Sequence, residues 1–377
     1  MLYAMGSIGL LGFLVWSQWL AFLRREFKVI NITIGWKGWY LLNTFYSSNV
    51  NKNAQSAGNL SIGSSETIRD DTYDLFYKNY NYIYKLKFKE DKNWLDWFIG
   101  FSEGDGAILE YNNNCKFVIT QKDVTILEHI QKIFNFGRIK YYYNNDKLSY
   151  GRFIVEDKKN IFLLYTLFNG NLYLNSRIIQ LNRWYKSLLY TPTNNFYKNL
   201  FNRCLPEGEE NIAIPHIIFI PKQITLNNAW LSGFTDAEGC FSVKIYKNRG
   251  IDYVKNVFIL DQKNSEILLN NISILLYNKS LAKLRKTLHN NVYRIEISCN
   301  HPIKNQNIPP LGAIIYFNKY KLKTTKSISF ELWCNIIDLS VGNQPLSLDK
   351  LNEIRKIRKK LNKFIIENNP IGHSSKS

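Results

Sequence analysis

Two short stretches of this chain match each other position by position: FIGFSEGDG at Phe98–Gly106 and LSGFTDAEG at Leu231–Gly239. Both copies have glycine at position three, phenylalanine at position four, acids at positions six and eight, and glycine at position nine. A tryptophan stands directly before each copy, at Trp97 and Trp230. A repeat of this length indicates an internal duplication. We therefore expect two similar half-domains that each contribute one acid to a shared site.

Small residues recur at helical spacing in both copies. Gly100 and Gly104 stand four residues apart on one helical face, and Gly233 and Ala237 stand at the matching positions. Small residues at this spacing allow two helix backbones to approach each other closely. These four residues predict that the two motif helices pack together as the interface between the half-domains.

The acids at position eight stand where the motif helices are expected to end. Gly106 and Gly239 predict C-terminal helix caps. Asp105 and Glu238 then lie at the negative end of a helix dipole, at a cost of about 0.3–1 kcal/mol each. Mutual repulsion of the two acids adds to that cost. Divalent cations bound between them would compensate. The alternative explanation is a pair of ordinary amphipathic helices with solvated acids.

The two segments resemble the paired motifs of single-chain LAGLIDADG homing endonucleases encoded in mitochondrial group I introns. The resemblance extends over about residues 92–370 and is looser at position one and at positions five to seven of the first copy. It implies an α+β fold of two pseudo-symmetric αββαββα half-domains with antiparallel, saddle-shaped sheets, packed through the motif helices. It also implies Mg²⁺ as the cofactor, with metal ligands at Asp105 and Glu238 together with Gly104 and Ala237.

The hydrophobic periodicity of each half agrees with the order α-β-β-α-β-β-α. In the first half, Asp123 is expected to cap a helix, and the other expected elements are strands at 116–121, 137–143 and 150–155 and helices at 161–168 and 174–190. In the second half we expect strands at 240–247, 253–260, 281–288 and 292–299 and helices at 265–277 and 325–339. The apolar face of the helix at 265–277 is expected to consist of Ile267, Leu268, Ile272 and Leu275.

Two further pairs of polar residues match between the halves. Gln121 and Gln262 each stand at the end of an expected strand, while Arg177 and Lys326 each precede a tryptophan by seven residues. By resemblance, the glutamines contact the reacting water, for which an amide can both donate and accept. The basic residues stand near the active site by the same resemblance, although lysine is usual there and Arg177 cannot act as a base. Exposed strand-end glutamines and chance basic residues are the alternatives.

The charge of the chain suits a polyanionic partner. The formal net charge of +19 favours nucleic acid over a membrane surface, and a generally basic structural protein is the alternative. Five scattered cysteines without a CxxC pair indicate free thiols. The resemblance implies that strands read double-stranded DNA in the major groove. The candidate contact residues are Arg138, Lys140 and Tyr142 in the first half and Lys244, Tyr246, Lys247, Arg285 and Arg294 in the second.

The two ends of the chain differ in composition from the half-domains. Residues 1–23 carry no charge and are long enough to span a bilayer, and residues 1–17 resemble exon sequence of cytochrome c oxidase subunit I. We expect an apolar, exon-derived helix at 1–26, a linker and poorly defined lead-in at 27–91, half-domains at 92–205 and 227–370, a linker at 206–226 and a disordered tail at 371–377.

The resemblance implies a monomeric, site-specific endonuclease that cuts both DNA strands at an intron-free exon junction and so promotes intron homing. It implies a mitochondrial location on the matrix side, with the apolar N-terminus tethering the chain to the inner membrane before processing. Two alternatives stay open. One is an RNA maturase that helps its own group I intron to splice, and the other is a membrane-anchored protein with a degenerate, inactive nuclease domain.

Overall fold

The computed structural model describes residues 72–190, 214–279, 281–284, 291–299, 312–340 and 345–368. The apolar segment expected at 1–26, the first part of the lead-in, residues 206–213 of the expected linker, the tail at 371–377 and Arg285 lie outside these ranges. Within the ranges, no helix is long and apolar enough to cross a membrane.

The first half of the described chain is an αββαββα unit followed by one more helix. Its strands form one antiparallel sheet in the order β1-β2-β4-β3. As the sequence predicts, the carboxylate of Asp123 caps a helix by accepting a hydrogen bond from the amide of Thr125. The elements are α5 (Lys92–Asp105), β1 (Gly106–Tyr111), β2 (Asn114–Gln121), α6 (Val124–Phe134), β3 (Arg138–Asn144), β4 (Lys147–Val155), α7 (Lys158–Phe168) and α8 (Asn175–Tyr190).

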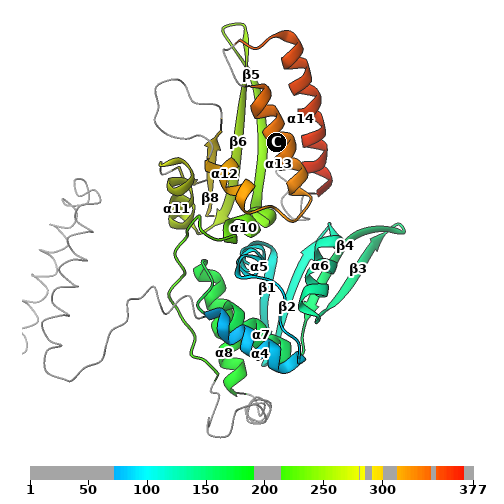
Figure 1. Ribbon diagram of the computed structural model, residues 1–377, viewed down its shortest axis with the longest axis vertical. Helices are drawn as coiled ribbons and strands as arrows, with labels where there is room; N and C mark the ends of the chain where they lie inside the picture. Colours follow the sequence, from blue (N-terminus) through cyan, green and yellow to red (C-terminus); the bar gives the residue numbers. More distant parts are fainter. Residues whose placement is uncertain are drawn as a thin grey trace, which may run out of the picture. The chain divides into compact units, whose positions relative to one another are not determined.

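The second half repeats this order and adds a C-terminal helix. Its sheet has the matching strand order, β5-β6-β8-β7. The elements are α10 (Trp230–Glu238), β5 (Gly239–Asn248), β6 (Ile251–Lys263), α11 (Glu266–Tyr277), β7 (Lys283–Leu284), β8 (Val292–Ser298), α12 (Gly312–Lys319), α13 (Lys326–Leu339) and α14 (Leu348–Asn368). Figure 1 shows the two units, each a sheet with its own helices. The expected α+β class with two pseudo-symmetric halves is confirmed.

Some elements differ from the sequence-based expectation. A helix, α4 (Thr72–Tyr84), occupies the end of the lead-in to which no structure was assigned, and it buries Tyr73, Phe76 and Tyr80. Strand β1 takes the place of the first strand in the expected α-β-β-α order, for which no residues were specified, and helix α12 is an addition to that order. The strand expected at 281–288 is described only at β7, since residues 285–290 lie outside the described ranges.

Helix α11 faces the core with a different side from the one that we expected. It buries Leu269, Ile272 and Leu276, whereas Ile267 and Leu275 are 78% and 42% exposed. The expected apolar face was therefore wrong apart from Ile272 and the partly buried Leu268. The helix carries apolar residues on most of its circumference, so its periodicity alone does not select the buried face.

Helices α5 and α10 pack with their backbones in contact, side by side at the centre of Figure 1. A β-carbon at Gly100 would collide with the carbonyl oxygen of Trp230, and one at Gly233 would collide with that of Trp97. At Gly104, the obstacle would be the methyl group of Ala237. Because the two backbones occupy the space that side chains would need, only small residues allow this approach.

Each motif helix passes directly into a strand at the glycine in position nine. Gly106 and Gly239 occupy the C-cap positions with φ of −81° and −79°, so neither adopts the left-handed backbone of the usual glycine cap. Steric room is the reason for glycine, because a β-carbon would collide with the carbonyl oxygen of Ser102 in one half and with Thr235 in the other. The acid before each glycine therefore stands at a rigid helix–strand junction.

Candidate active site

Asp105 and Glu238 are the last residues of the two packed helices, and each is partly buried. Burial raises the pKa of the Asp105 carboxyl group above its usual range. Burial and then the nearby charge of Asp105 raise the pKa of Glu238 to about 7. The helix pair thus holds two like charges close together in a poorly hydrated place, an arrangement that favours protonation or a bound cation.

In the first half, Arg177 from α8 binds the C-terminal end of α5. Its Nε and one terminal nitrogen donate to the carbonyl oxygen of Glu103 at 2.9 and 2.8 Å, and that terminal nitrogen also donates to the carbonyl oxygen of Gly104 at 3.1 Å. The other terminal nitrogen donates to Gln180. A guanidinium group in this place neutralises the negative end of the helix.

In the second half, Lys326 at the start of α13 takes the matching place. Its Nζ donates to the carbonyl oxygens of Thr235 at 3.1 Å and Ala237 at 2.7 Å, at the end of α10. Burial dominates the raised pKa values of the two acids, and the charges of Lys326 and Arg177 act against it by lowering the pKa of both. The two basic residues that match in the sequence therefore also occupy equivalent positions in the structure, each at the C-terminal end of the motif helix of its own half.

The acids at position six are buried links between the halves, which sequence reasoning missed. Glu103 is 1% exposed and accepts hydrogen bonds from the backbone amides of Tyr173 and Leu174. It also accepts one from the indole Nε1 of Trp230, on the opposite motif helix, at 2.7 Å. Burial raises the pKa of Glu103 to about 7, against the lowering effect of these hydrogen bonds.

Asp236 repeats these contacts in the second half. It is 3% exposed and accepts hydrogen bonds from the backbone amides of Lys323 and Thr324 and from the Thr324 hydroxyl group. The indole Nε1 of Trp97 donates to it from the other half at 2.8 Å. The tryptophan before each motif and the acid at position six were the visible signals for this exchange.

The comparisons with known proteins agree with this geometry. A family model described as LAGLIDADG endonuclease matches residues 231–337, from the second motif helix into α13. The chain is similar to "Probable intron-encoded endonuclease 4" of Neurospora crassa, with 33% identity over 276 residues that cover 71% of this chain. Residues 231–337 of the chain therefore match the LAGLIDADG endonuclease family. The match spans 44% of the length of that Neurospora relative.

Another relative and two solved structures extend the comparison to both halves. "Intron-encoded DNA endonuclease aI3" of Saccharomyces cerevisiae is 24% identical over 306 residues, covering 71% of this chain and 68% of that protein. The solved structure of meganuclease I-SmaMI bound to uncleavable DNA matches with a TM-score of 0.51 and 19% identity over 72% of this chain and 100% of that chain. The LAGLIDADG meganuclease I-AabMI bound to uncleaved DNA matches with a TM-score of 0.50 and 21% identity over 71% and 99%. These structures share the fold.

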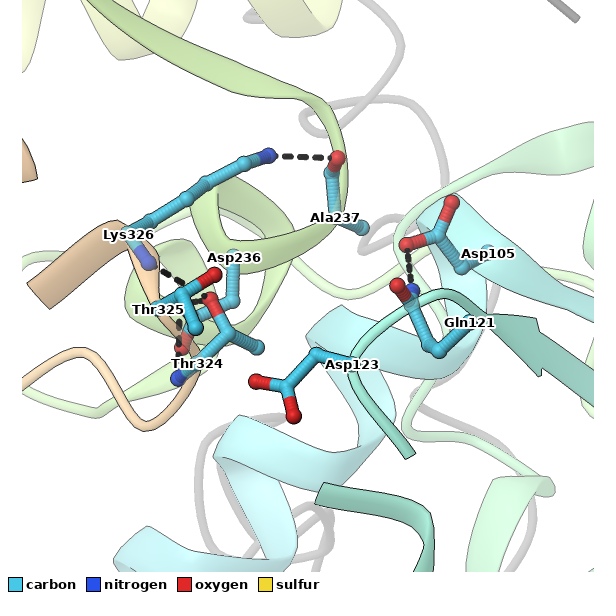
Figure 2. A pocket seen from close by; sticks show the side chains of 8 residues that line it. All are labelled: Asp105, Gln121, Asp123, Asp236, Ala237, Thr324, Thr325 and Lys326. Atoms are coloured by element: carbon cyan, nitrogen blue, oxygen red, sulfur yellow. Dashed lines mark hydrogen bonds between the residues drawn. The ribbon is translucent and has the colours of Figure 1, made fainter. Parts of the chain in front are cut away.

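The two candidate glutamines differ in their surroundings. Gln121 donates a hydrogen bond to the carboxylate of Asp105. Gln262 lines a separate, larger pocket beside Arg177, and the described residues include no hydrogen bond from it to Glu238. Figure 2 shows the smaller pocket, lined by Asp105, Gln121, Asp123, Asp236, Ala237, Thr324, Thr325 and Lys326. The candidate site is therefore asymmetric at its two glutamines.

The strand residues of the first half that we expected to contact DNA share one face of the sheet. Side chains alternate between faces along a strand, so Arg138, Lys140 and Tyr142 lie together, opposite the face that carries Ile139. Arg138 forms an ion pair with Glu156 at 2.8 Å, and Lys116 forms one with the same carboxylate at 2.6 Å. The basic face of this half thus includes an acid.

In the second half, the exposed candidate Lys247 lies on the opposite sheet face from Lys244 and Tyr246. The register of β5 against β6 is continuous, so Lys244 and Tyr246 share one face. Lys247 shares the other face with Ile245 and the buried Val243, which corrects the expectation that it lies on one face with those two residues. Lys244 forms an ion pair with Glu296 at 3.0 Å.

Proposed function

We propose that this LAGLIDADG protein is a site-specific endonuclease of double-stranded DNA, with Asp105 and Glu238 as its catalytic pair. The observation that carries the proposal is the burial of two like-charged acids at the meeting ends of two helices. A purely structural interface gains nothing from such a pair, since burial and repulsion both oppose ionisation. Phosphodiester hydrolysis assisted by divalent cations uses acids held in this way.

The donor atoms at this place fit Mg²⁺. The carboxylates of Asp105 and Glu238 and the carbonyl groups of Gly104 and Ala237 are hard oxygen donors of the kind that Mg²⁺ prefers. Each of the two carbonyl groups keeps a second lone pair beside its hydrogen bond to Arg177 or to Lys326. No group of three or more His, Cys, Asp or Glu side chains with metal-binding geometry occurs in the described ranges. Mg²⁺ commonly keeps several waters, so few protein ligands suffice.

The remaining residues have roles that follow from their positions. When bound, the cation supplies charge for the scissile phosphate and acidity for a bound water. Arg177 and Lys326 add positive charge beside the acids, where it stabilises negative charge that develops on the phosphate. Gln121 holds the carboxylate of Asp105 in one orientation through its hydrogen bond. Gln262 is assigned the corresponding place in the second half, where it can orient water.

We assign DNA contacts to the sheet faces that carry Lys140 and Tyr142 in the first half and Lys244, Tyr246 and Arg294 in the second. The net charge of +19 supports a polyanionic ligand. The biological role that we assign is homing at an intron-free exon junction in mitochondrial DNA. Two relatives are named intron-encoded endonucleases, which supports the intron-encoded origin in this role.

The test uses the full-length protein and a plasmid that carries the exon junction without the intron. The two exons are those that flank the intron in which this protein is encoded. We expect double-strand cleavage in Mg²⁺, no cleavage in EDTA, and no cleavage of a plasmid in which the intron interrupts the junction. Binding of intron RNA is measured at the same salt concentration, because affinities for polyanions depend steeply on salt. Tighter binding of the intron RNA than of the junction, without cleavage, would replace the endonuclease with the maturase.

A further inference from the structure

The two sheets carry an arginine at the same place, and the two arginines have different partners. Arg152 on β4 is the cross-strand partner of Thr120, the residue before Gln121. Arg294 on β8 is the cross-strand partner of Asp261, the residue before Gln262. Both arginines lie on the sheet face opposite the buried core residues, so both belong to the faces to which we assign DNA contacts.

Arg294 is held by carboxylates. Its Nε and a terminal nitrogen donate to the two oxygens of Asp261 at 2.6 Å each, and its other terminal nitrogen lies 3.5 Å from Glu296. The hydrogen bonds to Asp261 are the largest influence that raises the pKa of this arginine. This bidentate ion pair occupies the edge of the guanidinium group that would otherwise be available to bind a ligand.

Arg152 is held by aromatic rings. The rings of Tyr142 and Tyr150 stack with centroids 4.5 Å apart and planes inclined by 11°. The guanidinium carbon of Arg152 lies 5.1 Å from the centroid of Tyr142 and 5.6 Å from that of Tyr150. In the part of the chain that the structure describes, Arg152 has no ion pair, and its shielded Nε has no hydrogen-bond partner. Stacking orients a guanidinium group and leaves its hydrogen-bond donors available.

We propose that Arg152 reads a guanine near the cleavage site in one half of the DNA target, and that Arg294, held by Asp261, does not read the corresponding base in the other half. The proposal rests on the endonuclease function proposed above. The arginine fork matches the O6 and N7 atoms of guanine in the major groove. Arg152 is placed near the cut because its partner Thr120 adjoins Gln121, which binds Asp105. The cross-strand partner of each arginine decides whether the base is read. That partner is Thr120 for Arg152 and Asp261 for Arg294.

The experiment exchanges the two partners. Full-length wild-type protein and the variants Thr120→Asp and Asp261→Thr select binding sequences from a randomised duplex library in Ca²⁺. The wild type is expected to enrich a guanine at one position of one half-site, without a guanine at the pseudo-symmetric position. Thr120→Asp is expected to remove that preference, and Asp261→Thr is expected to add a guanine preference in the other half-site, each by roughly tenfold or more.

Arg152→Lys supplies a matched control, because it keeps the charge and loses the fork. We expect it to weaken the guanine preference, while its affinity for non-specific duplex at the same salt concentration changes less than fivefold because the charge is kept. Thermal unfolding identifies any variant that fails to fold. If Thr120→Asp fails to fold, Arg152→Lys tests the role of Arg152 in its place. An enriched sequence whose base preferences are the same in all variants would overturn this inference alone. A library that the folded wild type does not enrich would overturn the proposed function as well.

Discussion

The indole nitrogen of Trp97 donates a 2.8 Å hydrogen bond to the carboxylate of Asp236 on the opposite motif helix. Trp230 makes the reciprocal bond to Glu103 at 2.7 Å. All four side chains are buried, so each carboxylate depends on donors of the protein for its solvation. The exchange ties each half to the other beside the close contact of the two helix backbones.

Trp97→Phe and Trp230→Phe should each destabilise the protein by about 1.5–3 kcal/mol, the typical value of a hydrogen bond to a charged group. Denaturant unfolding measures the change. Trp184→Phe is the matched control, because its indole is equally buried and donates to the neutral carbonyl group of Leu109. We expect a loss of about 1 kcal/mol there. Equal losses in all three variants would mean that the indole–carboxylate bonds contribute nothing special.

Gly100→Ala and Gly233→Ala should destabilise the protein by at least about 3 kcal/mol, because a methyl group at either position meets the backbone of the opposite helix. Larger side chains such as leucine should prevent the halves from packing. Gly250→Asn is the control, since nothing lies within 4 Å of the added β-carbon and the φ of +83° adds only backbone strain, for which we expect a loss of about 1 kcal/mol. Thermal unfolding measures the stability of the three variants. Unchanged stability of both Gly100→Ala and Gly233→Ala would exclude the close packing of α5 against α10.

Asp105→Asn and Glu238→Gln should each abolish double-strand cleavage while DNA affinity in Ca²⁺ stays within roughly tenfold, since the proposed role of both acids is cation binding and not base reading. Glu331→Gln, at an exposed position of α13, should cleave like the wild type. Cleavage at the wild-type rate by either active-site variant would remove that acid from the catalytic pair.

The stability of the protein should depend on pH through Glu238. Burial and the charge of Asp105 raise the pKa of Glu238 from 4.5 to about 7, so the folded state binds its proton more tightly than the unfolded state. The resulting stabilisation is complete below about pH 4.5 and is lost as the pH rises through about 7. Glu238→Gln lacks this loss, so its melting temperature relative to wild type should rise across that interval.

A divalent cation should change this comparison. Above about pH 7, Ca²⁺ should stabilise the wild type, because it binds the ionised carboxylates of the folded state, and should stabilise Glu238→Gln much less. Glu331→Gln, measured in parallel, should follow the wild type at every pH and Ca²⁺ concentration. Melting temperatures of wild type and Glu238→Gln that stay parallel across the pH range would show that Glu238 titrates normally.

Local pattern in the sequence was sufficient for most of the fold. The repeated motif predicts two similar halves, and Asp123 marks the start of α6. The failures have identifiable physical causes. Helix α11 is apolar on most sides, so its buried face depends on what packs against it. Lys247 was misplaced because three basic or aromatic residues in β5 were treated as one surface, although strand alternation separates it from Lys244 and Tyr246.

The sequence by itself determined that two helices would end in paired acids with small residues along their contact face. Only the tertiary structure decided what the other motif positions do. Glu103 receives its hydrogen bonds from residues 70 and more positions away, and the bond from Trp97 to Asp236 spans 139 positions. Likewise, Arg152 and Arg294 differ through their cross-strand neighbours. Helix ends and periodicity depend on residues a few positions apart, whereas burial and pairing depend on segments that meet only when the chain has folded.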